Sequence, residues 1–334
     1  MRFPRPALVL ACACLWLAAC GPSEPSGGTT AKYEIAVVPK GTTHEFWKSI
    51  HAGAVKAERE LVARGIVTQV VWQGPLKEDD RDAQIQVVEN FVTRRVSGIV
   101  LAPLDARALV RPVDSAIAAG IPVVIIDSGL ERQTASFVAT DNYEGGAMAA
   151  RHLAELLGGT GKVILLRYAV GSASTEQREK GFLDELAKNY SGLELISGTE
   201  YAGATRDTAY RTSQALLNRY GDQVNGIFAV NESATIGMTL ALRESGKAGG
   251  KVRMIGFDAG TQSIEDLANG DVQALVVQNP LRMGYEGVMT AVSAIRGETV
   301  APRIDTGVVL VTAQNMNSEA VRPLLHPPLA EYLD

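Results

Sequence analysis

Short apolar runs alternate with amphipathic stretches along most of the chain. The runs are rich in β-branched residues, and the stretches between them carry apolar residues at helical spacing. In the first half this pattern predicts strands at 35–38, 67–72, 98–102 and 122–126, and helices at 44–64, 79–95 and 106–119. Near-continuous apolar strands that alternate with helices are typical of a parallel sheet covered on both faces.

The same alternation returns in the second half. It predicts strands at 162–167, 193–201, 226–230 and 252–257, and helices at 175–189, 206–220, 232–245 and 261–269. About 300 residues follow position 32, which is more than one compact core normally takes. We therefore expect an α/β fold of two similar doubly wound parallel-sheet lobes, with a crevice between them.

The first twenty residues have the features of an export signal. Arg2 and Arg5 precede an apolar segment at 7–19, which is too short for an ordinary membrane helix, and small residues precede Cys20. The position of Cys20 resembles the lipobox of bacterial lipoproteins, in which this cysteine is lipidated and becomes the new N-terminus. We expect a lipoprotein signal peptide at 1–20 and a flexible tether at 21–32. An ordinary signal peptide or an uncleaved anchor is the alternative.

Composition excludes several classes of function. Cys12, Cys14 and Cys20 are the only cysteines, so the part after position 20 has no disulfide, cysteine nucleophile or Cys-ligated zinc. Removal of Arg2 and Arg5 lowers the basic count of 32 by two against 37 acidic residues, which gives a net charge of −7. This charge argues against nucleic acid as a partner.

Polar side chains follow the predicted strands with unusual regularity. Open α/β sheets bind ligands at the carboxyl ends of their strands. Carboxylate, amide, hydroxyl and ammonium groups suit the hydroxyls of a polyhydroxylated ligand, and aromatic faces suit its ring C–H groups. The candidates after the strands are Lys40, Asp127, Ser128, Asn231, Asp258 and Gln278, and the turn into the first helix adds His44, Phe46 and Trp47.

Further motifs recur in a fixed order. The aromatic pair is followed by Asp127, then by Asp141-Asn142 with Gly145-Gly146, Arg178-x-x-Gly181-Phe182, Asn231, Gly256-Phe257-Asp258 and Gln278. With these motifs the chain resembles, from 32 to about 316, the periplasmic sugar-binding proteins of ABC importers in the ribose-binding (type I) group. The resemblance implies a lipoprotein form of a solute receptor that closes on a monosaccharide or small polyol and delivers it to a permease.

The resemblance also implies lobe boundaries and residue roles. Three crossings near Asp141, Gln278 and Ile304 would join an N-terminal lobe (33–141 with 279–304) to a C-terminal lobe (142–278 with 305–320), with a tail at 321–334. The roles it implies are hydroxyl binding by Asp127, Asn231, Asp258 and Gln278, a forked pair of bonds from Arg178, a binding role for Asn142, and ring stacking by Phe46 or Trp47 against Tyr201 or Phe257.

Two positions depart from the ribose pattern. Ribose binders of this group carry arginine where Ser128 stands and asparagine where Ala102 stands. Lys40, Gly74-Pro75 and Asp127-Ser128 look more like the branch that binds rhamnose and autoinducer-2. The ligand is therefore expected to be a small polyol or a sugar other than ribose. Lys40 and His44 are also compatible with a more oxidised or anionic sugar.

The sequence gives less support to an enzyme or to a transcriptional repressor. The glycine-rich segment 158–162 fails the phosphate-loop spacing and fits a turn between a helix and a strand, and no nucleophile–base pair is evident. His44 and His51 alone make no metal site, so we expect no metal, no cofactor and no enzymatic activity. A repressor would need a helix-turn-helix where the export signal stands.

A receptor for a sugar or an autoinducer-2-like ligand that presents its closed form to a membrane sensor is the remaining alternative. It would use the same two-lobed clamp as a transport receptor. We expect a monomer on the periplasmic or cell-surface side, held to the membrane by its lipid.

Overall fold

The computed structural model describes Met1 and residues 32–333. The expected signal peptide, Cys20 and nearly all of the tether lie outside the described residues. Lys32–Asp334 forms one compact unit. Among its described helices, none combines the length and the apolar character that a membrane crossing requires.

Two six-stranded sheets organise this unit, and each defines one lobe. The first lobe has the strand order β11-β5-β4-β3-β1-β2, all parallel, and the second has β12-β10-β9-β8-β6-β7, in which only β12 is antiparallel. The strands of the first lobe are β1 (Tyr33–Val38), β2 (Thr68–Trp72), β3 (Gly98–Leu101), β4 (Val123–Ile126), β5 (Ser136–Ala139) and β11 (Arg303–Asp305). Those of the second are β6 (Gly161–Leu166), β7 (Leu193–Ser197), β8 (Gly226–Ala229), β9 (Arg253–Phe257), β10 (Ala274–Gln278) and β12 (Val308–Thr312).

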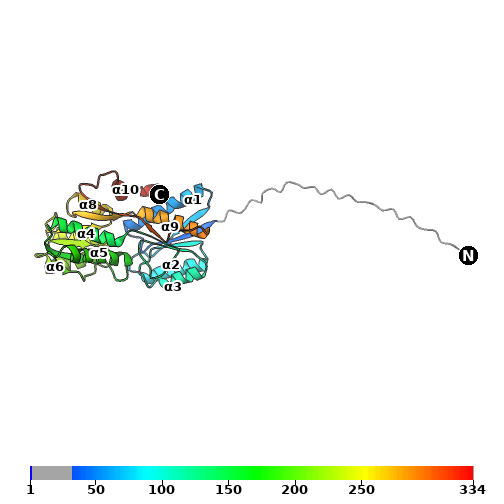
Figure 1. Cartoon of the computed structure of the whole chain (residues 1–334), viewed down its shortest axis with the longest axis horizontal. Helices are drawn as coiled ribbons and strands as arrows, with labels where there is room; N and C mark the ends of the chain where they lie inside the picture. The colour runs from blue at the N-terminus through cyan, green and yellow to red at the C-terminus, as the bar shows by residue number, and fades with distance from the viewer. Residues whose placement is uncertain (2–31, 334) are drawn as a thin grey trace. The chain divides into compact units, whose positions relative to one another are not determined.

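Helices cover both faces of each sheet and bury its central strands on both sides (Figure 1). In the first lobe α1 (Glu45–Ala63) and α9 (Pro280–Ile295) cover one face, and α2 (Arg81–Arg94) and α3 (Val110–Ala118) cover the other. In the second lobe α4 (Asn142–Leu156) and α5 (Ala173–Asn189) lie opposite α6 (Arg206–Tyr220), α7 (Glu232–Glu244) and α8 (Thr261–Ala268). The predicted two-lobed α/β fold is confirmed.

The chain passes between the sheets three times, after β5, after β10 and between β11 and β12. Most predicted elements match within a few residues, but the predicted strand 193–201 ends at Ser197 and the predicted helix 106–119 begins only at Val110. The second difference has a local cause: the Asp105 carboxylate accepts the backbone N–H groups of Arg107 and Ala108, which holds a turn there. The elements β5, α4, β10, α9, β11 and β12, and two short helices after residue 320, are additional to those predicted from the sequence.

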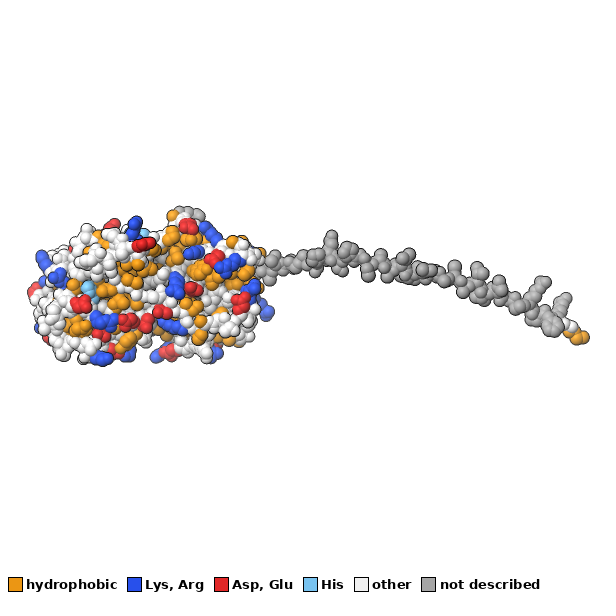
Figure 2. All heavy atoms as spheres, turned by 45° about the horizontal axis from the view of Figure 1, so that its top comes forward, with side chains coloured by type: hydrophobic (Ala, Val, Ile, Leu, Met, Phe, Trp, Pro, Cys, Tyr) orange, Lys and Arg blue, Asp and Glu red, His pale blue; other side chains and the backbone are white. Residues whose placement is uncertain are grey.

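The face drawn in Figure 2 carries polar, charged and hydrophobic side chains in a mixed pattern. On the face drawn in Figure 2, Lys and Arg are interspersed with Asp and Glu, and that face shows no continuous basic patch.

The last residues of the chain form a segment that contacts both lobes. Val321 and Leu325, at the short helix α10 (Arg322–Leu325), are buried in the core of the second lobe. The following helix α11 (Leu329–Leu333) packs on α1 of the first lobe, where Arg59 donates to the carbonyl oxygen of Glu331 at 2.6 Å. We call residues 321–333 the C-terminal strap.

Glycines bring one helix pair in each lobe into close contact. In the second lobe, α4 and α5 touch at Gly146 and Gly181, where a Cβ would overlap the carbonyl oxygens of Arg178 and Tyr143 respectively. In the first lobe, a Cβ on Gly53 of α1 would overlap the carbonyl oxygen of Leu281 in α9. The glycines in the motifs Gly145-Gly146 and Arg178-x-x-Gly181 are therefore explained by close packing.

We predict that Gly146→Ala lowers the free energy of unfolding by about 1–3 kcal/mol, the usual cost of overpacking a tight contact. Urea denaturation measures the change. Gly129→Ala is the matched control, since its Cβ would meet nothing closer than 3.7 Å. Equal stability of the two variants would contradict the close-packing argument.

Candidate ligand-binding site

Two aspartates take the same unusual backbone conformation at corresponding strand ends. Asp127 follows β4 with φ 60°, and Asp258 follows β9 with φ 70°. Positive φ is uncommon for residues other than glycine, but aspartate tolerates it. β4 and β9 are both third from one edge of their sheets, so the two lobes present equivalent carboxylates to the crevice. Both side chains are buried and line one cavity between the lobes. We call it the inner cavity.

Lys40 pairs with the first of these carboxylates. Its Nζ lies 2.9 Å from Asp127 Oδ2 and also donates to the hydroxyls of Ser174, at 3.1 Å, and Ser172, at 3.4 Å. Gln84 fixes the backbone here, because its amide donates to the carbonyl oxygens of Pro39 and Ala102 at 2.8 Å each. The ammonium group therefore spans from the first lobe to the second.

Glu78 is a second bridge between the lobes. Its Oε1 accepts a hydrogen bond from Trp47 Nε1 at 2.7 Å and lies 2.6 Å from His44 Nδ1, and its Oε2 accepts one from the Tyr168 hydroxyl of the second lobe at 2.6 Å. Burial opposes both charges. Even so, the Glu78 carboxylate raises the pKa of His44 to about 9, and His44 with the Tyr168 hydroxyl lowers the pKa of Glu78 to about 2. The pair is a buried ion pair near neutral pH.

Arg178 is held rigidly inside the second lobe. Its Nε donates to Asn142 Oδ1 at 2.8 Å, one Nη donates to the carbonyl oxygen of Val230 at 2.9 Å, and its guanidinium lies 3.7 Å from the ring centroid of Phe257. Burial lowers the pKa of Arg178 from its ordinary value. The side chain is therefore oriented before any ligand arrives, and its Nη1 lies 4.0 Å from Asp258.

Asp258 is part of a hydrogen-bonded wall at one end of the inner cavity. Gln278 Nε2 donates to its Oδ1 at 2.7 Å, and the backbone N–H of Glu232 donates to its Oδ2 at 3.2 Å. Burial raises the pKa of Asp258 to about 6, although Arg178 and Gln278 act in the opposite direction. Glu232 in turn accepts the backbone N–H of Phe46 at 3.2 Å, which joins the wall to the first lobe.

The structure brings most of the expected site residues to the inner cavity. Those that line it are Lys40, His44, Phe46, Trp47, Asp127, Arg178, Asn231, Asp258 and Gln278. Ser128 and Asn142 lie one layer behind: the Ser128 hydroxyl accepts the backbone N–H of Ser174 at 3.0 Å, and Asn142 orients Arg178.

The two aromatic partners expected from the second lobe do not line the inner cavity. Phe257 is the last residue of β9, so its ring points into the core while Asp258 points to the cavity, and it is fully buried beneath Arg178. Tyr201 is 37% exposed and carries the guanidinium of Arg167 over its ring. Tyr168 supplies the ring on that side instead.

The sequence interpretation missed five residues that line the cavity. They are Glu78, Tyr168, Ser174, Thr175 and Glu232. Tyr168 comes just after β6, so the strand-end rule that selected Lys40 after β1 also points to it. Glu78 lies in a loop between β2 and α2 that has no strand-end signal.

The charged side chains of the inner cavity face partners of opposite charge. Lys40 faces Asp127, His44 faces Glu78, and Arg178 lies closest to Asp258. Glu232 pairs with Arg206 at 2.9 Å. The cations are therefore already matched, and the site offers donors and acceptors in similar measure.

No metal-binding cluster of His, Cys, Asp or Glu occurs in the described residues. His51 stacks on Trp72 with ring centroids 4.5 Å apart. Residues 158–160 lie in the turn between α4 and β6 that the sequence predicted, and residues 161–162 begin β6.

Comparison with known proteins gives a consistent result. The family described as "Periplasmic binding protein domain" matches residues 35–299. The D-ribose/D-allose-binding protein of Pseudomonas aeruginosa is 30% identical over 297 residues, which cover 85% of this chain and 90% of that protein.

Two solved structures of similar proteins align over nearly their whole length. A carbohydrate transporter solute-binding protein from Agrobacterium radiobacter, in complex with D-arabinose, is 34% identical with a TM-score of 0.84, covering 89% of this chain and 100% of that one. An ABC transporter solute-binding protein from Agrobacterium vitis, with bound D-fucose, is 36% identical with a TM-score of 0.83, covering 88% and 100%.

We predict that the His44–Glu78 pair makes stability fall in alkali. The raised pKa of His44 contributes stability that is full below pH 6.5 and is lost as the pH rises through about 9. One proton limits the slope to about 1.4 kcal/mol per pH unit. Urea denaturation at pH 6.5 and 9 should show that His44→Gln removes part of this loss. His152→Gln, whose ring pairs with the exposed Glu155, should not. An unchanged pH dependence in His44→Gln would contradict the assignment.

Proposed function

Because the chain belongs to the periplasmic binding protein family, in its ribose-binding-like type I group of ABC sugar importers, we propose that it captures a neutral monosaccharide or small polyol between its lobes and delivers it to an importer permease. Members of this family are non-enzymatic transport receptors, so family membership confirms the prediction that the chain is not an enzyme. It also supports an exported, periplasmic location.

One observation carries the proposed ligand class: a buried polar cavity is built from both lobes, with one strand-end aspartate from each. Asp127 and Asp258 would accept hydrogen bonds from sugar hydroxyls, and Lys40, Arg178 and Asn231 would donate. Phe46 and Trp47, which meet edge to face at 5.0 Å, give the cavity an apolar wall for ring C–H groups.

The paired charges favour a neutral ligand. An anionic sugar would need a cation without a partner, and Lys40 and His44 each face a carboxylate instead. Burial of an additional, unmatched charge would cost several kcal/mol. The names of the similar proteins mention ribose, allose, arabinose and fucose. These sugars are uncharged, which supports the same conclusion.

The closed lobes are the form we propose to engage the permease. Contacts across the crevice join Lys40 to Ser174, Glu78 to Tyr168, and Phe46 to Glu232. A ligand that bonds to both sides would add to these contacts and favour closure. Sheet membership supports the lobe boundaries proposed from the sequence, 33–141 with 279–304 and 142–278 with 305–320.

We expect monosaccharides to raise the melting temperature in a thermal-shift screen, since a ligand that binds only the folded state stabilises it. Calorimetry with the best sugar should show that Asp127→Asn and Asp258→Asn each weaken binding by about 10- to 100-fold, the value of a hydrogen bond to a charged group. Asparagine tolerates the positive φ at both positions, so the backbone is preserved.

Asp184→Asn is the control for these two variants, because Asp184 is exposed on α5. It should bind like the wild type. Wild-type affinity in both cavity variants would show that sugars bind elsewhere.

We also propose that Cys20 carries a lipid that anchors the chain to a membrane, as its lipobox-like position suggests. Cys20→Ser should then move the protein from the membrane fraction to the soluble fraction, or leave its signal peptide uncleaved. Cys14→Ser is the control. Normal processing and membrane fractionation of Cys20→Ser would refute the lipid anchor.

A further inference from the structure

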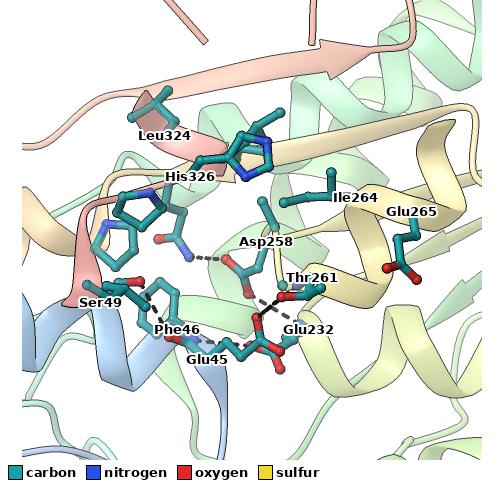
Figure 3. A pocket seen from close by; sticks show the side chains of 18 residues that line it. Glu45, Phe46, Ser49, Glu232, Asp258, Thr261, Ile264, Glu265, Leu324 and His326 are labelled. Carbon is teal, nitrogen blue, oxygen red and sulfur yellow. Dashed lines mark hydrogen bonds between the residues drawn. The ribbon is translucent and has the colours of Figure 1, made fainter. Parts of the chain in front are cut away.

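A second cavity of about 400 Å³ adjoins the inner cavity. Phe46, Glu232, Asp258 and Gln278 line both cavities and form the wall between them. Figure 3 shows this second cavity, which we call the outer cavity, between the start of α1, the start of α8 and the C-terminal strap.

The outer cavity differs from the inner one in its chemistry. Much of its lining is carbon, from Phe46, Ile264, Leu324, Leu325 and Pro327. Glu45 lies at its edge and already accepts bonds from the backbone N–H and hydroxyl of Thr261, at 2.8 and 2.9 Å. The space therefore suits an apolar group far better than a second set of hydroxyls.

The shared wall lies where the two lobes meet. Phe46 comes from the first lobe, Glu232 and Asp258 come from the second, and Gln278 is the last residue of β10, just before the crossing. The wall is closed across the lobes by the bond from the Phe46 N–H to Glu232. A ligand that enters while the lobes are apart can occupy the inner cavity and extend past the wall, and it then takes the place of this bond when the lobes close.

One atom of the wall has no hydrogen-bond partner among the described residues. Gln278 is 2% exposed, and its Nε2 donates to Asp258, but its Oε1 accepts no bond. A buried amide oxygen without a partner is costly. A sugar hydroxyl placed beside the wall would donate to it, which locates one edge of the sugar ring at the entrance to the outer cavity.

We propose that the outer cavity holds the apolar aglycone of a neutral glycoside whose sugar occupies the inner cavity. The ligand class is then alkyl or aryl glycosides in addition to free sugars. A dry cavity of about 150 Å³ lined by Leu, Ile and Phe accommodates benzene, so the outer cavity has room for an aromatic ring. This inference rests on the proposed function of the inner cavity.

The experiment is calorimetry on the wild-type chain. D-ribose, D-allose, D-arabinose and D-fucose are titrated first, followed by the methyl and phenyl glycosides of each in both anomeric forms. We expect a phenyl glycoside of at least one sugar to bind about tenfold more tightly than the matching methyl glycoside, because apolar pocket contacts typically contribute that much.

Variants test whether the tighter binding of the phenyl glycoside comes from the outer cavity. Ile264→Ala and Leu324→Ala should reduce the preference for phenyl over methyl while the free sugar binds as before. Leu240→Ala, at a leucine 42% exposed on α7, should preserve the preference.

The two proposals fail separately. If free sugars bind but every phenyl glycoside is rejected or gains nothing over its methyl counterpart, the aglycone site is wrong and the sugar site stands. The aglycone site is also wrong if the preference persists in both outer-cavity variants. If neither sugars nor glycosides bind, both proposals fail.

Discussion

A single carboxylate joins the two lobes through bonds that it accepts from both. Glu78 is nearly inaccessible to solvent and accepts from His44 and Trp47 on one side and from Tyr168 on the other. A buried charge of this kind is stable only while its partners remain in place. The arrangement of Phe46 and Trp47, the position of His44 and the contact between the lobes therefore depend on one another.

The two lobes share equivalent structural features. Each ends its third strand from the edge in an aspartate with positive φ, and each packs one helix pair through glycines that admit no Cβ. The helix contact in the second lobe also touches the backbone of Arg178, which links packing directly to the site. In the proposed closure, rigid lobes of this kind would move as bodies, and the change would fall on the three crossings.

The fold and much of the site follow from local rules in the sequence. Alternating apolar runs and amphipathic stretches predict parallel sheets, and the carboxyl ends of such strands must meet at one edge, which is why Lys40, Asp127, Asn231 and Asp258 lie together. Phe257 shows the limit of the rule. Neighbouring residues at a strand end point in opposite directions, and sequence position alone does not say which one faces the crevice.

Other parts depend on contacts that no local pattern encodes. Glu78 reaches the cavity from a loop, and its three partners come from two lobes and from positions up to ninety residues away. The outer cavity likewise needs the last residues of the chain, which were expected to be only a tail, to lie beside the start of α1 and α8. Such sites form where segments that are distant in the sequence come together, so they are recognised only in the three-dimensional structure.

The C-terminal strap differs from the three crossings in one thermodynamic respect. The crossings are covalent and persist in every conformation, whereas α11 is held on α1 by packing and by the bond from Arg59. Only His326, Pro327 and Pro328 separate it from α10, so its local concentration at α1 is high and sensitive to the span between the lobes. The strap is thus a reversible fourth connection, whose strength changes with the separation of the lobes.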